Sequence, residues 1–129
     1  MLGTRLLSNF FVRLRYPFSL PEEISEALGI PLSNQIAFHK LIAYLRSPHC
    51  RPAKLLKTMP REEAEATFRN ASYSDHFHQT SSFSYHFSEG CLEFVLLFDK
   101  ASKLKRLYLR FREFPEEGGI EISLDSPGS

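Results

Sequence analysis

Residues 83–98 have the sequence FSYHFSEGCLEFVLLF, in which two alternating runs flank a turn. In the first run, aromatic residues occupy every second position from 83 to 87. In the second, large hydrophobic residues occupy every second position from 92 to 98. A period of two is the pattern of a β-strand with one buried face, and Ser-Glu-Gly at 88–90 favours a tight turn. The stretch therefore predicts an antiparallel hairpin.

The alternating pattern continues toward the C-terminus. Leucine and phenylalanine recur at every second position over 107–111, and isoleucine or leucine does so over 120–124. Val95 and Leu97 make the second face of the 91–99 run apolar as well. A strand that is apolar on both faces must be central, and short connections favour antiparallel neighbours. We expect a four-stranded antiparallel meander.

The first sixty residues are divided by six of the eight prolines, which favours short helices because proline starts or ends a helix. The third predicted helix follows Ser33, has an almost wholly apolar circumference, and should be the central buried one. In the fourth, Glu65 should pair with Arg69, and a further helical turn is expected over 52–59. The four helices are expected at 4–15, from Ser19 to Gly29, from Ser33 to Leu45, and at 60–71.

The predicted fold class is α+β, with short N-terminal helices packed on one face of the C-terminal sheet. A length of 129 residues with 43% hydrophobic content favours one domain over residues 1–129, mainly helical over 1–72 and mainly sheet over 78–125. No apolar run approaches the roughly 20 residues that span a bilayer. Cys50 and Cys91 have no CxxC partner, which favours reduced thiols in a cytoplasmic protein; one long-range disulfide is the alternative.

Residues 1–20 differ in composition from the rest. They contain three arginines and no acidic residue, and their large hydrophobics recur at helical spacing. This composition is typical of an organelle transit peptide or of a helix at a membrane surface, and it equally suits an amphipathic helix packed on the core. We prefer the packed helix, with targeting and peripheral membrane contact as alternatives. The hydrophobic positions are Leu6, Leu7, Phe10, Phe11 and Leu14.

Charge is distributed unevenly along the chain. Residues 1–61 contain nine basic and three acidic residues, a balance of +6, whereas residues 62–129 contain seven basic and twelve acidic residues, a balance of −5. The first part can therefore attract an anionic partner. The candidate partner-binding residues are Lys40, Arg46, Arg51, Lys54 and Lys57. The competing interpretation is a solvated surface whose charges meet the acids of the second part, and that outcome would undermine the hypothesis.

A second candidate surface lies on the predicted strand that begins at Lys103. Basic residues interleaved with an aromatic can follow a nucleic-acid backbone and stack a base. Glu93 and Glu121 on the neighbouring strands could instead pair with the arginines, and we favour this ladder. The residues that would form a nucleic-acid face are Arg106, Tyr108, Arg110 and Arg112.

Histidines supply the one cluster with titratable chemistry. His76 and His78 would share a face of an extended segment, with Phe77 facing the core, and Asp75 could orient an imidazole. His86 is the third histidine of the group. Exposed histidines are common in loops, so we assign them no catalytic role and predict no metal or cofactor. Cys50 follows His49, but no third partner can be placed, so we predict an inert thiol.

The leading functional hypothesis is a non-catalytic binding module, adaptor or chaperone-like, that engages an acidic or amphipathic protein partner through the basic helical half. The first alternative is a nucleic-acid-binding protein. The second is an enzyme or small-ligand binder with a cavity between helices and sheet. Outer strands of the sheet could also pair with a second copy to form a homodimer.

Overall fold

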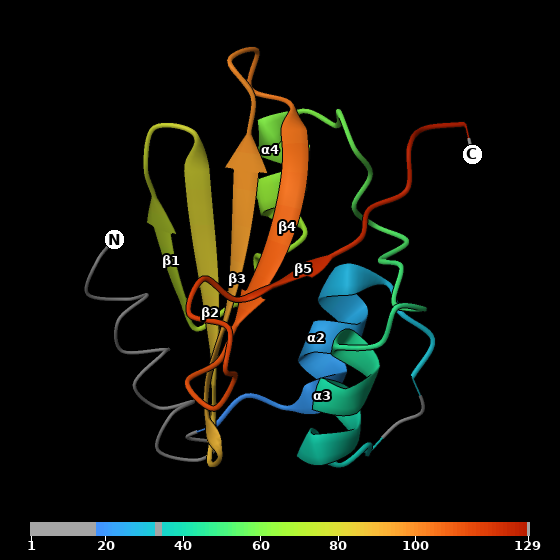
Figure 1. Cartoon of the computed structure of the whole chain (residues 1–129), viewed down its shortest axis with the longest axis vertical. Helices are drawn as coiled ribbons and strands as arrows, with labels where there is room; N and C mark the ends of the chain where they lie inside the picture. The colour runs from blue at the N-terminus through green and yellow to red at the C-terminus, as the bar shows by residue number, and fades with distance from the viewer. Residues whose placement is uncertain (1–17, 33–34, 129) are drawn as a thin grey trace.

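The computed structural model describes residues 18–32 and 35–128, in which three helices pack on one face of a five-stranded sheet (Figure 1). The first predicted helix, at 4–15, and the predicted cap Ser33 lie outside these residues. The helices are α2 (Pro21–Leu28), α3 (Phe38–Leu45) and α4 (Arg61–Ala66). The strands are β1 (Tyr73–His76), β2 (Thr80–Phe87), β3 (Gly90–Phe98), β4 (Leu104–Arg110) and β5 (Ile120–Ile122).

The sheet is an antiparallel meander in the order β1-β2-β3-β4-β5, which confirms the predicted α+β class. The strand at 90–98 is central, as its two apolar faces predict. β1 is an additional strand that the sequence did not predict, because all four of its side chains are exposed and it carries no apolar alternation. Its backbone pairing with β2 is what makes it a strand.

Helix α2 has the sequence signals that its position requires. Pro21 occupies the first turn, where a missing N–H costs no hydrogen bond, and Glu22 and Glu23 lie at the positive end of the helix dipole. Gly29 ends the helix in the left-handed conformation, with φ of 70°. The buried side of α2 consists of Ile24, Ala27 and Leu28.

Three details of the predicted helical half are wrong. Helix α3 is peripheral rather than central, because only Leu41 and Leu45 among its residues are buried. The segment 52–59 contains turns but no helix, since its backbone hydrogen-bonds to β4 and to Asp125 instead. Glu65 pairs with Arg61 in the preceding turn of α4, and not with Arg69.

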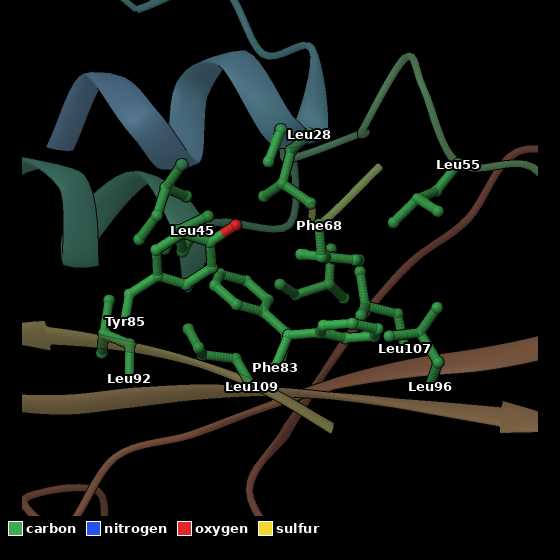
Figure 2. Packing of buried hydrophobic residues seen from close by; sticks show 14 of the residues in the cluster. Leu28, Leu45, Leu55, Phe68, Phe83, Tyr85, Leu92, Leu96, Leu107 and Leu109 are labelled. Carbon is green, nitrogen blue, oxygen red and sulfur yellow. The ribbon is translucent and has the colours of Figure 1, made fainter. Parts of the chain in front are cut away.

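Aromatic and aliphatic side chains fill the layer between helices and sheet (Figure 2). Phe68 stacks on Phe83 with 4.9 Å between ring centroids and lies 5.4 Å from the ring of Phe94. Tyr85 is fully buried and donates its hydroxyl to Asn70 Oδ1 at 2.5 Å, while Asn70 Nδ2 donates to the Glu23 carbonyl at 2.9 Å. The sheet is thus tied through Asn70 to helix α2.

Among the described helices, none combines the length and hydrophobicity that a membrane crossing requires.

Candidate functional site: a lysine cluster at one end of the sheet

Two of the predicted partner-binding residues face carboxylates from the C-terminal part of the chain. Arg46 Nη2 lies 3.4 Å from Glu116 Oε1, and its guanidinium also lies 4.6 Å from the ring centroid of Phe114. Arg51 Nε lies 3.7 Å from Asp125 Oδ1. Both arginines are therefore partly neutralised within the fold, as the competing interpretation of the charge pattern anticipated.

The three predicted lysines have different surroundings. Lys54 Nζ donates to the Glu26 carbonyl at 2.7 Å, where a cation at the C-terminal end of α2 meets an unpaired helix carbonyl. Lys40 lies exposed on α3. Lys57 is exposed, and its backbone N–H donates to the Asp125 carbonyl at 2.9 Å. Over residues 18–32 and 35–128, every ion pair within 4.0 Å uses arginine or histidine, and none uses lysine.

Lys57 lies beside the start of β4, which places it among further cations. The Thr58 N–H donates to the Leu104 carbonyl at 2.7 Å, and the Leu104 N–H donates to the Met59 carbonyl at 2.9 Å. These bonds hold the 57–60 loop along the edge of β4. A surface hollow of about 350 Å³ results, lined by Lys57, Thr58, Asp99, Leu104, Lys105 and Arg106.

Asp99 is the one acidic residue lining this hollow, and one of its carboxylate oxygens is engaged by the backbone. Asp99 Oδ1 accepts hydrogen bonds from the backbone N–H groups of Ala101 at 2.9 Å and Lys103 at 3.0 Å. These bonds close the turn between β3 and β4, the uppermost loop in Figure 1. We define the lysine cluster as the cations that line the hollow together with those of the adjoining β3–β4 turn. The first group is Lys57, Lys105 and Arg106, and the second is Lys100 and Lys103.

The sequence interpretation missed Lys100, Lys103 and Lys105 because they fall in the part of the chain with a net negative balance, and it assigned Arg106 to the nucleic-acid face. A local signal was present. Residues 100–112 contain six basic residues and no acidic one. Lys57 belongs to the N-terminal part of the chain, and it lies near these residues only because the 57–60 loop pairs with the backbone of β4.

The predicted nucleic-acid face is a cross-strand ladder. Arg110 Nη1 lies 3.3 Å from Glu93 Oε1 on β3, and Arg106 Nη1 lies 3.9 Å from Glu121 Oε1 on β5. Tyr108 lies between the two arginines on the same face and is half-buried. Arg112 is exposed beyond the end of β4. The sequence predicted these cross-strand pairs of arginines with Glu93 and Glu121, and the observed strand register brings them together.

The structure does not bring the histidines together. His76 lies in β1, His78 follows in the β1–β2 turn, and His86 lies near the other end of β2, opposite Cys91. Phe77 is 68% exposed, so the prediction that it faces the core is wrong; it follows an edge strand whose side chains are all exposed. Across the described ranges, no group of three or more His, Cys, Asp or Glu side chains is placed to hold a metal ion.

His76 instead joins a polar network between α4 and the β1–β2 hairpin. His76 Nδ1 lies 3.0 Å from Glu65 Oε2 and 3.2 Å from Ser81 Oγ, and the Ser81 hydroxyl also donates to Glu65. In a Ser-His-acid triad the serine and the carboxylate occupy opposite imidazole nitrogens. Here both lie at Nδ1, and Ser81 is fully buried, so the network has the geometry of a structural link.

Both cysteines are free. Burial raises the pKa of the Cys50 thiol to about 11, against the opposing effect of Arg51. Because the thiolate is the reactive form, Cys50 is chemically quiet at neutral pH. Cys91 is exposed at the start of β3.

Comparison with known proteins finds no matching family model, no similar curated protein and no similar solved structure.

Proposed function

We propose that this chain is a non-catalytic binding module, adaptor or chaperone-like, that engages an acidic, amphipathic segment of a protein partner. The observation that supports the proposal is the lysine cluster: Lys57, Lys105 and Arg106 line one hollow beside the β3–β4 turn, and Oδ1 of the neighbouring Asp99 accepts two backbone hydrogen bonds within that turn. The proposal keeps the acidic partner inferred from sequence. It shifts the contact surface away from Lys40, Arg46, Arg51 and Lys54 and toward Lys57 and the β3–β4 turn.

Lysine ammonium groups that lack a carboxylate neighbour are available to a partner. A charge pair at 4 Å gains about 1 kcal/mol in bulk water and about 4 kcal/mol near a protein surface, so several such pairs can steer and hold an acidic segment. The Thr58 hydroxyl adds a hydrogen-bonding group to the hollow. The arginines at 46 and 51 would first have to leave Glu116 and Asp125.

Nucleic-acid binding is the second candidate, because Arg106 belongs both to the lysine cluster and to the Arg106, Tyr108, Arg110 row on β4. Phosphate contacts in this row would compete with Glu93 and Glu121. An acidic peptide that binds Lys57, Lys103 and Lys105 would not have to displace a carboxylate, because no described ion pair uses these lysines. A small-ligand site between helices and sheet gains no support, since aromatic side chains occupy that layer.

The experiment compares two probes by fluorescence anisotropy: an amphipathic helical peptide of glutamate and leucine, and a peptide of the same composition in scrambled order. We expect tighter binding of the amphipathic peptide, and loss of that binding in the Lys103→Glu, Lys105→Glu variant. The matched control is Lys40→Glu, Arg69→Glu, which changes net charge equally at two exposed positions elsewhere.

Equal binding of the two peptides would reduce the effect to general charge attraction and overturn the proposal. Equal weakening by both variants would do the same. A single-stranded oligonucleotide serves as a third probe: tighter binding to it than to the peptide, with a steep decline as salt rises, would favour the nucleic-acid alternative.

A further inference from the structure

Two β-bulges meet at the hollow beside the β3–β4 turn, and the first of them lies in β4. Leu97 on β3 pairs with Arg106, but the next residue, Phe98, pairs with Leu104. Lys105 is therefore an extra residue on β4. In a regular strand, neighbouring side chains lie on opposite faces, but here Lys105 and Arg106 are both exposed and both line the hollow. The bulge thus brings two consecutive cations to one site.

The second bulge lies in the 57–60 loop. The Thr58 N–H donates to the Leu104 carbonyl at 2.7 Å, whereas the Leu104 N–H donates to the Met59 carbonyl at 2.9 Å. Two consecutive residues thus oppose one residue of β4, which is the arrangement of a bulge. Thr58 has a φ of 70°, and a β-branched residue is an outlier in this left-handed region, where bulges commonly have glycine. Such costly backbone conformations cluster at functional sites, and this one lies next to Lys57 at the hollow.

The charges that line the hollow do not cancel. Three cations, Lys57, Lys105 and Arg106, accompany the single carboxylate of Asp99, a formal balance of +2. Asp99 Oδ1 accepts two backbone hydrogen bonds within its own turn. Arg106 is shared with a neighbour, because its Nη1 lies 3.9 Å from Glu121 Oε1, but both partners of this pair are about half exposed and water weakens it.

The charged groups around the hollow add to its positive balance. Lys100 and Lys103 are exposed in the β3–β4 turn, and none of the ion pairs over residues 18–32 and 35–128 uses them. The Asp125 carbonyl accepts the Lys57 N–H, but the Asp125 carboxylate lies 3.7 Å from Arg51 Nε. This carboxylate is therefore balanced by a cation outside the lysine cluster.

A balance of two positive charges suits a phosphoryl group better than a carboxylate. A phosphate monoester carries a charge of about −1.5 to −2 at pH 7 and has three strong acceptor oxygens, whereas a glutamate side chain carries one charge on two oxygens. The guanidinium of Arg106 can donate two N–H groups to such oxygens, and the two lysines of the lining add point charges. Clusters of this kind recognise phosphorylated and acidic peptide motifs.

A peptide is a better source of this phosphoryl group than a nucleic acid or a lipid. A nucleic acid presents a row of phosphates, but Arg110, the next arginine along β4, lies 3.3 Å from Glu93 Oε1. A lipid surface also needs apolar anchors. Of the lining residues that the structure describes, Leu104 alone is hydrophobic, and it is buried.

We infer that the hollow binds a phosphorylated serine or threonine within the acidic segment of the partner. The inference rests on the proposed function and specifies the ligand of the same site. Lys57, Lys105 and Arg106 contact the phosphoryl oxygens, while the lysines of the β3–β4 turn attract the acidic residues on either side. The Thr58 hydroxyl donates to the Lys57 carbonyl, so its role is to hold the loop.

The test compares two amphipathic helical peptides of glutamate and leucine that differ at two adjacent central positions. One has phosphoserine-alanine there and the other has glutamate-glutamate, so their net charges are nearly equal and a difference in affinity reports the phosphoryl group. By fluorescence anisotropy, the wild-type protein should bind the phosphopeptide at least about tenfold more tightly.

The Lys57→Gln, Lys105→Gln variant should lose this preference while it stays folded by circular dichroism. The matched control is Lys40→Gln, Arg69→Gln, which removes the same charge at two exposed positions elsewhere and should keep the preference.

Four outcomes would overturn the inference. Equal binding of the two peptides, still dependent on the lysine cluster, would overturn it and leave the proposed function intact. Binding of neither peptide would overturn both. A preference for the phosphopeptide that persists in the Lys57→Gln, Lys105→Gln variant would place phosphoryl recognition elsewhere. Tighter binding to phosphatidate-containing vesicles or to a single-stranded oligonucleotide, lost in the same variant, would assign the phosphoryl group to a lipid or a nucleic acid.

Discussion

Arg61 Nε lies 2.9 Å from Glu65 Oε2, one turn further along α4, and the same guanidinium reaches the β1–β2 hairpin. Its Nη1 donates to the His78 carbonyl at 2.6 Å, and its Nη2 donates to the Phe77 carbonyl at 2.8 Å and to Ser81 Oγ at 3.1 Å. One side chain thus fixes the edge of the sheet to the helical layer.

Replacing this arginine should therefore destabilise the fold. Arg61→Ala removes charge-assisted hydrogen bonds in a partly buried site, and we expect a loss of about 1.5–3 kcal/mol in the free energy of unfolding. Urea denaturation followed by circular dichroism measures it. Arg69→Ala, at an exposed position just beyond α4, should change stability by no more than about 0.5 kcal/mol. Equal effects of the two substitutions would show that the link to the hairpin is unimportant.

The same network predicts a dependence of stability on pH. Burial raises the pKa of Glu65, but hydrogen bonds from Ser81, Arg61 and His76 together outweigh it, so the pKa is lowered. A carboxylate with a depressed folded-state pKa stabilises the protein above its ordinary pKa of about 4.3, and this stabilisation is lost as pH falls through the folded value.

The wild-type protein should therefore exceed Glu65→Gln in stability at pH 6, and the difference should shrink steadily below pH of about 4.3. Urea midpoints of both proteins across this range provide the measurement. A difference that is constant with pH would mean that the charge of Glu65 contributes nothing.

Tyr85→Phe tests the link between the sheet and α2. The substitution keeps the ring but leaves Asn70 Oδ1 without the hydroxyl that donates to it. We expect a loss of about 1–3 kcal/mol, the usual cost of an unsatisfied polar group in a buried site. The double substitution Tyr85→Phe, Asn70→Ala should cost less than the sum of the two single ones, because the two side chains are coupled. Strict additivity would contradict the hydrogen bond.

Thiol labelling should distinguish the two cysteines. Maleimide should modify Cys91 in the folded protein at neutral pH because its side chain is exposed, whereas Cys50, which is 1% exposed, should react only after unfolding. Burial raises the pKa of both thiols, that of Cys50 to about 11. Mass spectrometry of the labelled protein counts the modified thiols. Cys91→Ser should abolish labelling of the folded protein, and residual fast labelling would show that Cys50 is accessible.

The fold was largely predictable from sequence because buried and half-buried positions alternate strictly over the strand at 80–87 and, from Leu92 onward, over the strand at 90–98. Alternation is a local signal of a buried face. β1 lacks that signal, since its four side chains are exposed and backbone pairing alone defines it. The prediction that α3 is the central buried helix was wrong for the opposite reason. The helix has several apolar residues, but only Leu41 and Leu45 are buried in the core.

The candidate site was less predictable, because it depends on contacts between distant segments. Counting charges along the chain assigned Lys100, Lys103 and Lys105 to a net-acidic part. The pairing of Thr58 with Leu104 places Lys57 beside them, and no local pattern encodes that pairing. Contacts between segments far apart in the sequence likewise place Glu116 beside Arg46 and Asp125 beside Arg51.

The most direct measurement is the dissociation constant of the amphipathic acidic peptide for the Lys103→Glu, Lys105→Glu variant relative to its charge-matched control. Our account predicts that the cluster variant binds at least about tenfold more weakly than the Lys40→Glu, Arg69→Glu control, a difference of about 1.4 kcal/mol. Equal dissociation constants for the two variants would contradict the assignment of the lysine cluster as the binding surface.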